Sequence, residues 1–168
     1  MGMSVTIAAA DEDDAEEILK LQYLCYQSEA ELYGDYSLEP LTQSLAALRA
    51  ELGAGRVLAA RLGTEVVGSV RGAVDSEGTA VITGLIVHPR LRRHGLGGRL
   101  LDAIEEQLAA ESAVRYRLAV GRRSEISLRL CRERGYIPTG GTERVSRALT
   151  LVTLEKPVAE VPALAASR

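Results

Sequence analysis

The 168-residue sequence is poor in the residues on which several functional classes depend. Its two cysteines, Cys25 and Cys131, are too few for a disulfide framework and lack the C-x-x-C spacing of a metal site. Its two histidines, His88 and His94, belong to no H-E-x-x-H pattern or comparable cluster. We therefore expect no bound metal.

The sequence also lacks a surplus of positive charge and any long apolar run. The formal net charge is -3, whereas a DNA-binding domain usually carries a basic excess, so we expect no nucleic-acid partner. No apolar run approaches the length that crosses a membrane, and the N-terminal residues show no basic segment of a signal peptide. These features predict a cytoplasmic protein without membrane association.

Apolar periodicity and turn residues predict one mixed α/β domain (α+β-like) over residues 4–155, followed by a flexible C-terminal tail over 156–168. Strands are predicted at 4–9, 56–62, 66–74, 79–87 and 114–120, with one or two more within 142–154. Helices are predicted at 11–27, 41–52, 95–110 and 124–134. The polar segment 28–40 is expected to be irregular.

The most informative segment is 85–101, where an apolar strand ends at Pro89, a basic turn carries glycines, and a helix follows. Such a joint places free main-chain N–H groups and arginines where an anion would bind. A Walker A loop is excluded because no lysine follows either glycine, and a dinucleotide-binding fingerprint would need glycine at Leu100. The pattern that remains is R-x-x-G-x-G.

This pattern resembles the acetyl-CoA motif of the GNAT superfamily of N-acetyltransferases, V-x-P-x-x-R/Q-x-x-G-x-G-x-x-L. The residues at its defined positions are Val87, Pro89, Arg92, Gly95, Gly97 and Leu100. The resemblance extends from near Ser4 to about Leu154. It implies a central, mostly antiparallel sheet flanked by helices, with a strand that splays at the cofactor site, and acetyl-CoA as the donor.

The resemblance also assigns the cofactor-binding residues. They are Leu85, Ile86 and Val87 on the strand, then Arg92, Arg93, His94, Gly95, Leu96, Gly97 and Gly98 in the turn and helix start, and Ser124. Glycines would let the main chain approach the pyrophosphate without a Cβ clash, and the helix dipole favours the anion. A main-chain N–H on the strand would polarise the thioester carbonyl. The side chains of His88 and His94 are expected to be solvated.

A second family pattern, N-x-x-A-x-x-L-Y-x-x-x-G-F/Y, aligns on 124–136 with departures that affect the chemistry. Cys131 stands where the resemblance implies a tyrosine that protonates the thiolate, and Ser124 stands in place of asparagine. Cys131 could serve as the general acid or form an acetyl-cysteine, although no histidine base is near it in sequence. The alternative is a small buried hydrophobe, with water as the proton source.

The acceptor side is less determined by the sequence. Glu29 and Tyr33, four residues apart, are our first candidates for an acceptor site or base, because acidity there suits a cationic amine; a solvated polar loop is the alternative. We therefore predict acetyl transfer to a primary amine of a small molecule or peptide by direct attack. A non-catalytic acyl-CoA-binding sensor is the competing hypothesis. Exposed strands near the C-terminus suggest a homodimer.

Overall fold

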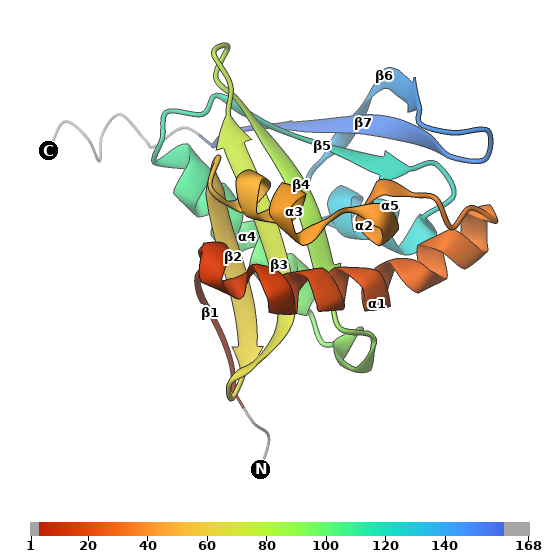
Figure 1. The fold of residues 1–168 in the computed structure, drawn as a ribbon. Helices are drawn as coiled ribbons and strands as arrows, with labels where there is room; N and C mark the ends of the chain where they lie inside the picture. The colour runs from red at the N-terminus through yellow and green to blue at the C-terminus, as the bar shows by residue number, and fades with distance from the viewer. Residues whose placement is uncertain (1–3, 160–168) are drawn as a thin grey trace, which may run out of the picture.

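The structure, a computed structural model, describes residues 4–159, in which seven strands form one sheet in the order β1-β2-β3-β4-β5-β7-β6 (Figure 1). Neighbouring strands pair antiparallel except β4 and β5, which are parallel. This mostly antiparallel sheet with helices confirms the expected mixed α/β fold. The strands are β1 Val5–Ala9, β2 Arg56–Leu62, β3 Glu65–Val74, β4 Thr79–Val87, β5 Arg115–Gly121, β6 Ile137–Arg144 and β7 Thr150–Pro157.

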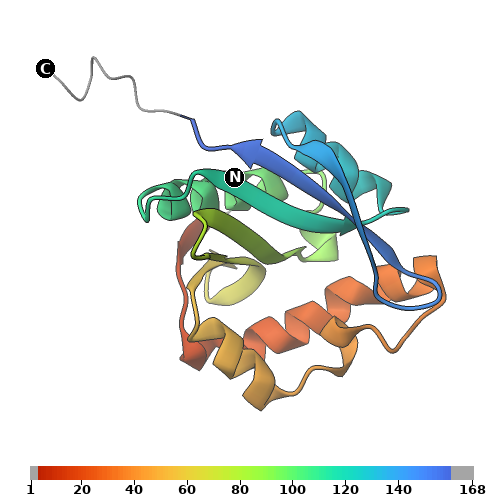
Figure 2. The same ribbon diagram turned by 90° about the horizontal axis from the view of Figure 1, so that it is seen from above.

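Helices cover both faces of the sheet, with α1, α2 and α3 on one side and α4 and α5 on the other (Figure 2). Their bounds are α1 Ala15–Tyr33, α2 Glu39–Thr42, α3 Leu45–Leu52, α4 Leu96–Ala109 and α5 Glu125–Glu133, with single 3-10 turns η1 Glu12–Asp14 and η2 Pro89–Leu91. Within residues 4–159, no helix is both long and apolar enough to cross a membrane.

Each face of the sheet has its own apolar core. On one face, the residues of α4 predicted to repeat at helical spacing are buried: Leu96, Leu100, Ile104 and Leu108. On the other face, α1 and α3 bury Ile18, Leu21 and Leu48 against β2 and β3. The two cores fix the helices on the sheet and thereby position α1 and the start of α4 on opposite faces of β4.

The predicted end of the first helix at Gln27 is wrong, because α1 continues to Tyr33. Ala30 and Tyr33 are buried, which supplies the apolar face that the polar composition of the segment conceals. Gly34 then ends the helix in a left-handed conformation with φ 63°, and its N–H donates to Ala30 O and Glu31 O. The segment 28–33 is therefore helical rather than irregular.

Two further boundaries differ from the prediction. The second predicted helix is split at Gln43 and Ser44, because the Ser44 side chain accepts from Ala47 N–H at 3.1 Å and caps α3. At the C-terminus β6 and β7 form a hairpin that begins at Ile137, and β7 extends through Lys156 and Pro157 into the segment predicted as a tail. Residues 160–168 of that predicted tail lie outside the described residues.

Candidate active site

Strands β4 and β5 diverge near the centre of the sheet. Their parallel pairing joins Thr79–Val81 of β4 to Arg115–Arg117 of β5. Beyond this point β4 carries a bulge, because its register with β3 shifts between Ser69 and Arg71 and Gly84 takes a left-handed φ of 64°. The C-terminal half of β4 is separated from β5, which confirms the expected splayed strand.

The splay turns one edge of β4 toward a gap. Ile86 lies opposite Ser69 of β3, and the N–H of His88 donates to β3 at 2.8 Å. Because main-chain direction alternates along a strand, the N–H and C=O groups of Leu85 and Val87 point toward the gap. Of the three strand residues assigned to the cofactor, Ile86 directs its main chain to β3 instead. A strand edge of this kind can pair with the amides of an extended ligand.

The N-terminus of α4 is open to an anion. Gly95 is its N-cap with φ 75°, and Arg99 N–H donates to Gly95 O at 3.1 Å as the first bond of the helix. The N–H groups of Leu96, Gly97 and Gly98 precede this bond and therefore have no acceptor inside the helix. Together with the helix dipole they favour a negatively charged group.

Three basic residues lie in the turn before α4. Arg92, Arg93 and His94 are all exposed, as expected for a site that meets a charged ligand from solvent. Arg93 has a φ of 70°, a conformation that non-glycine residues rarely adopt. Exposed guanidinium groups can add charge-assisted hydrogen bonds to a phosphate held by the main chain.

Two glycines inside α4 make room for α5, a role that the sequence analysis missed. A Cβ at Gly97 would lie 3.2 Å from Leu130 Cδ2, and a Cβ at Gly98 would overlap the guanidinium of Arg134. At Gly95, a Cβ would meet nothing within 4 Å. Gly97 and Gly98 are therefore required by the packing of α5, whereas the close approach of a phosphate to the three glycines stays a prediction.

Helix α1 bridges the two splayed strands on the other face of the sheet. At β4, the Cys25 thiol donates to Val87 O at 3.2 Å. Seen from above, the C-terminal part of α1 lies toward the β6–β7 hairpin (Figure 2). There Ser124 Oγ, just after β5, donates to Glu29 Oε2 at 2.8 Å and lies 2.9 Å from the Tyr33 hydroxyl. One face of α1 therefore spans the gap between the strands.

The hydrogen bonds at this far end form a directed chain. Arg123 N–H donates to the Tyr33 hydroxyl at 2.9 Å. The Ser124 hydroxyl has one proton and donates it to Glu29. In the contact between the two hydroxyl groups, Tyr33 is therefore the donor and Ser124 the acceptor. The chain orients the Glu29 carboxylate and uses one of its two oxygens. The two residues that the sequence assigned to the acceptor site, Glu29 and Tyr33, thus meet around Ser124, which was assigned to the cofactor.

Tyr26 completes the face of α1, one turn before Glu29, and was missed by the sequence analysis. Its phenol is half-buried, and burial, followed by the negative charge of Glu29, raises the pKa of Tyr26 to about 12. Tyr26 is therefore protonated at neutral pH and can donate a hydrogen bond. The i, i+3, i+7 spacing of Tyr26, Glu29 and Tyr33 would have revealed the face if the helix had been extended past Gln27.

Comparison with known proteins decides the family. The profile of the acetyltransferase (GNAT) family matches residues 15–136, most of the chain. The chain belongs to the GNAT acetyltransferase family. The family supports acetyl-CoA-dependent acyl transfer in general. A search of curated proteins finds no match.

Solved structures agree with the GNAT fold. The PaiA N-acetyltransferase of Thermoplasma acidophilum, in complex with coenzyme A, is 18% identical with a TM-score of 0.74, and covers 92% of this chain and 99% of that chain. YncA of Salmonella typhimurium, a putative acetyltransferase with acetyl-CoA, is 21% identical with a TM-score of 0.73, covering 94% and 96%. A GNAT acetyltransferase of Streptococcus pneumoniae is 18% identical with a TM-score of 0.74, covering 93% and 100%.

Cys131 lies in the core of this GNAT domain rather than on the face of α1. Its side chain is 2% exposed and belongs to the apolar cluster under α4. Burial, followed by the charge of Glu105, raises the pKa of Cys131 to about 11. Glu105 itself accepts from the Tyr136 hydroxyl at 2.6 Å and from Lys156 Nζ at 2.8 Å, a buried structural network. These surroundings favour the interpretation of Cys131 as a small buried hydrophobe.

We expect Cys131→Ala to leave kcat at saturating acetyl-CoA within about twofold of the parent value, because the thiol is buried. The free energy of unfolding should fall by about 1 kcal/mol, since the smaller side chain leaves a void. Steady-state kinetics and urea unfolding measure the two effects. A fall in kcat of about 100-fold, with binding intact, would instead return Cys131 to the mechanism as the general acid.

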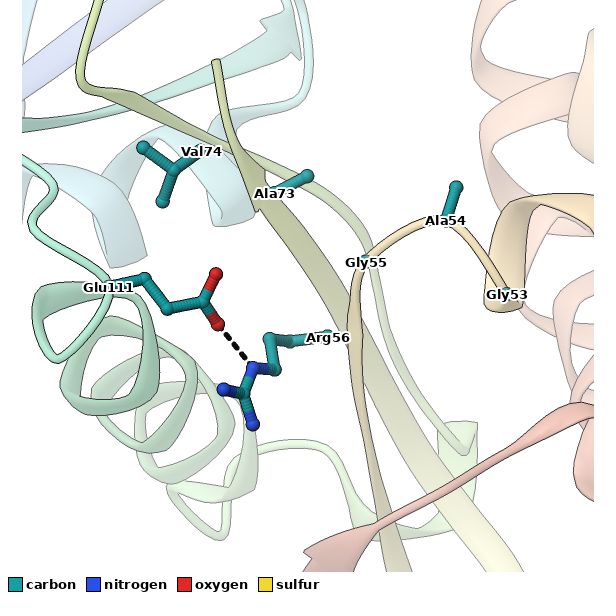
Figure 3. A pocket seen from close by; sticks show the side chains of 7 residues that line it. All are labelled: Gly53, Ala54, Gly55, Arg56, Ala73, Val74 and Glu111. Atoms are coloured by element: carbon teal, nitrogen blue, oxygen red, sulfur yellow. Dashed lines mark hydrogen bonds and ion pairs between the residues drawn. The ribbon is translucent and has the colours of Figure 1, made fainter. Parts of the chain in front are cut away.

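One hollow lies elsewhere on the GNAT domain. A pocket of about 350 Å³ is formed by the segment before β2, the end of β3 and the end of α4 (Figure 3). Its polar groups are Arg56 and Glu111, which form an ion pair with one another. Because these charges are already matched and no part of the β4–β5 gap lines the pocket, it takes no part in the candidate active site.

Proposed function

We propose that the protein transfers the acetyl group of acetyl-CoA to a primary amine of a small molecule or peptide by direct attack. The main observation behind the proposal is that α1 crosses the gap where β4 and β5 separate. Its Glu29 is bonded through Oε2 to Ser124 beyond β5, while Cys25 is bonded to β4. A thioester held in the gap would have the gap-facing edge of β4 on one side and Glu29 on the other.

The donor would be held by main-chain groups along its length. The N–H groups of Leu96, Gly97 and Gly98 at the start of α4 suit the pyrophosphate, with Arg92, Arg93 and His94 around it. The gap-facing edge at Leu85 and Val87 suits the pantetheine amides. Other acyl-CoA donors could use the same contacts, so the acyl group is assigned from the family.

Each step of the transfer except the second deprotonation of the amine and the protonation of the thiolate can be assigned to a group in this chain. An ammonium acceptor would pair with Glu29, whose Oε1 has no hydrogen-bond partner within residues 4–159, and lose a proton there. The neutral amine would attack the thioester carbon, forming the C–N bond. A main-chain N–H of Leu85 or Val87 would stabilise the oxyanion. The nitrogen of the intermediate gives its second proton to water, the C–S bond breaks, and water protonates the thiolate, because Cys131 lies in the core. The proton taken by Glu29 then passes to solvent. One proton is released per turnover.

Release of free thiol from acetyl-CoA with a panel of primary amines tests the proposal. We expect release that saturates with amine concentration and is negligible without amine. Tight CoA binding with no turnover across a broad panel would instead support a non-catalytic acyl-CoA sensor, the hypothesis favoured by the missing tyrosine at position 131. The cytoplasmic location and the homodimer stay predictions from the sequence.

A further inference from the structure

Arg71 of β3 is a buried cation whose hydrogen-bonding capacity is largely unused. Its side chain is 11% exposed. The Nε and Nη1 atoms are buried and have no hydrogen-bond partner among the described residues. The paired carboxylate is that of Glu51, at 3.8 Å from Nη2, and Glu51 also accepts from Gln43. Buried donors without acceptors cost stability, so an arginine kept in this state calls for an explanation.

The guanidinium lies on the bulge that creates the splay. A Cβ built at Gly84 would be 2.8 Å from Arg71 Cζ and 3.0 Å from both Nη atoms, so the guanidinium covers the Gly84 main chain. The absence of a side chain at Gly84 is what admits it. Arg71 is thereby fixed against the stretch of β4 that would hold the thioester carbonyl.

Arg71 also lies on the face of the sheet that α1 covers, where we place the acceptor. Its partner Glu51 lies on α3, on the same side of the sheet as α1 (Figure 1). The Tyr26 phenol is close enough to feel the charges of both Arg71 and Glu29. A cation at the bulge and an anion toward β5 therefore both lie near Tyr26. An acceptor that lies along this face meets both signs of charge.

We propose that Arg71 binds a carboxylate of the acceptor, so that the acceptor class is an amine that also carries a carboxylate. This inference rests on the proposed acetyl transfer. A guanidinium offers a planar pair of N–H donors that matches a carboxylate, and such bonds are strong where water is excluded. The carboxylate at Arg71 would direct the amine of the same molecule toward Glu29 and the thioester. Part of the side chain is exposed, while Nε and Nη1 are themselves covered.

Pairs of acceptors that differ only in the carboxylate provide the test. Glycine, leucine, lysine and glutamate are each compared with the corresponding carboxamide at saturating acetyl-CoA. For the acceptor that reacts best, the parent protein should prefer the carboxylate by about 10- to 100-fold in kcat/KM, which is the worth of hydrogen bonds to a charged group. Arg71→Gln should reduce this preference to near unity by raising KM for the carboxylate, with the carboxamide unaffected.

Two controls separate recognition from a structural role. Arg61→Gln removes another partly buried strand arginine, one already paired with Asp14 at 2.6 Å, and should leave the preference unchanged. The melting temperature of Arg71→Gln should not fall, because the change removes buried donors that lack acceptors. Arg71→Lys should recover only part of the preference, since an ammonium lacks the planar fork.

The outcomes that overturn the inference are distinct from failure of the proposed function. Equal turnover of carboxylates and carboxamides by the parent protein overturns the inference alone. So does an equal loss with both acceptors in Arg71→Gln, particularly with a lowered melting temperature, since that pattern marks a structural arginine. Absence of thiol release with every amine overturns the proposed function, and the inference falls with it.

Discussion

Gly95→Val is expected to weaken acetyl-CoA binding by about 100-fold, the worth of roughly two charge-assisted hydrogen bonds. Gly95 caps α4 with φ 75° and ψ 9°, and this left-handed residue aims the N–H groups of Leu96, Gly97 and Gly98 at one point. A β-branched residue disfavours the conformation by about 1–2 kcal/mol, so the turn should change course and the N–H groups should lose their common direction. Calorimetric titration with CoA measures the effect.

Gly63→Val is the matched control for the loss of binding. Gly63, in the turn between β2 and β3, has φ 64° and, like Gly95, has open space where a Cβ would stand. Both substitutions should therefore destabilise the fold by similar amounts, but only that at Gly95 should weaken CoA binding. Equal affinity in the two variants, both folded, would show that the start of α4 does not hold the cofactor. Gly97 is a poorer test, because a side chain there also meets Leu130.

Glu29→Gln is expected to lower kcat/KM for the amine by about 100-fold, the usual contribution of a general base. The amide keeps the size of the side chain and can still accept from Ser124, so the hydrogen-bonded end of α1 should persist. It removes the charge that pairs with an ammonium and the group that takes its proton. The affinity for CoA, bound along β4 and α4, should stay unchanged. Steady-state kinetics with the best amine, together with CoA titration, measures both.

Glu16→Gln controls for the loss of one negative charge on the same helix. Glu16 lies in the first turn of α1, is exposed, and faces Lys20 at 3.9 Å. Turnover should equal that of the parent protein, because an exposed ion pair contributes little to stability. Glu16 also lies more than three helical turns along α1 from Glu29. If Glu16→Gln lowers kcat/KM as much as Glu29→Gln does, Glu29 contributes only to the overall negative charge of α1. If CoA affinity falls with Glu29→Gln, the carboxylate belongs to the cofactor site instead.

Local signals made much of the fold predictable. The bounds of β2 and β4 agree with the sequence prediction, because turn residues such as Gly63 and Gly78 stand between apolar runs. The helix after the motif was predictable because its apolar residues repeat at helical spacing. The end of α1 was not, because the buried residues Ala30 and Tyr33 stand among polar neighbours, and their burial depends on partners remote in sequence.

The candidate site depends more heavily on distant contacts. The bond from Ser124 to Glu29 joins residues 95 positions apart, so no spacing could reveal it. The same limit applies to Gly97 and Gly98, whose neighbours come from α5. In the sequence, nothing distinguishes Arg71 from the other arginines predicted in strands. Only the folded structure shows that its guanidinium lies against Gly84, at the bulge beside the gap. The sequence motif therefore predicts the donor, whereas the acceptor side emerges only from the packing of α1 on the sheet.

A crystal structure of the protein with CoA tests the central claim most directly. We predict that the pyrophosphate accepts from the N–H groups of Leu96, Gly97 and Gly98, and that the pantetheine arm pairs with Leu85 and Val87. The sulfur should then lie between β4 and β5 on the side of Glu29. CoA bound away from the start of α4, or a sulfur separated from α1 by the sheet, would contradict the account.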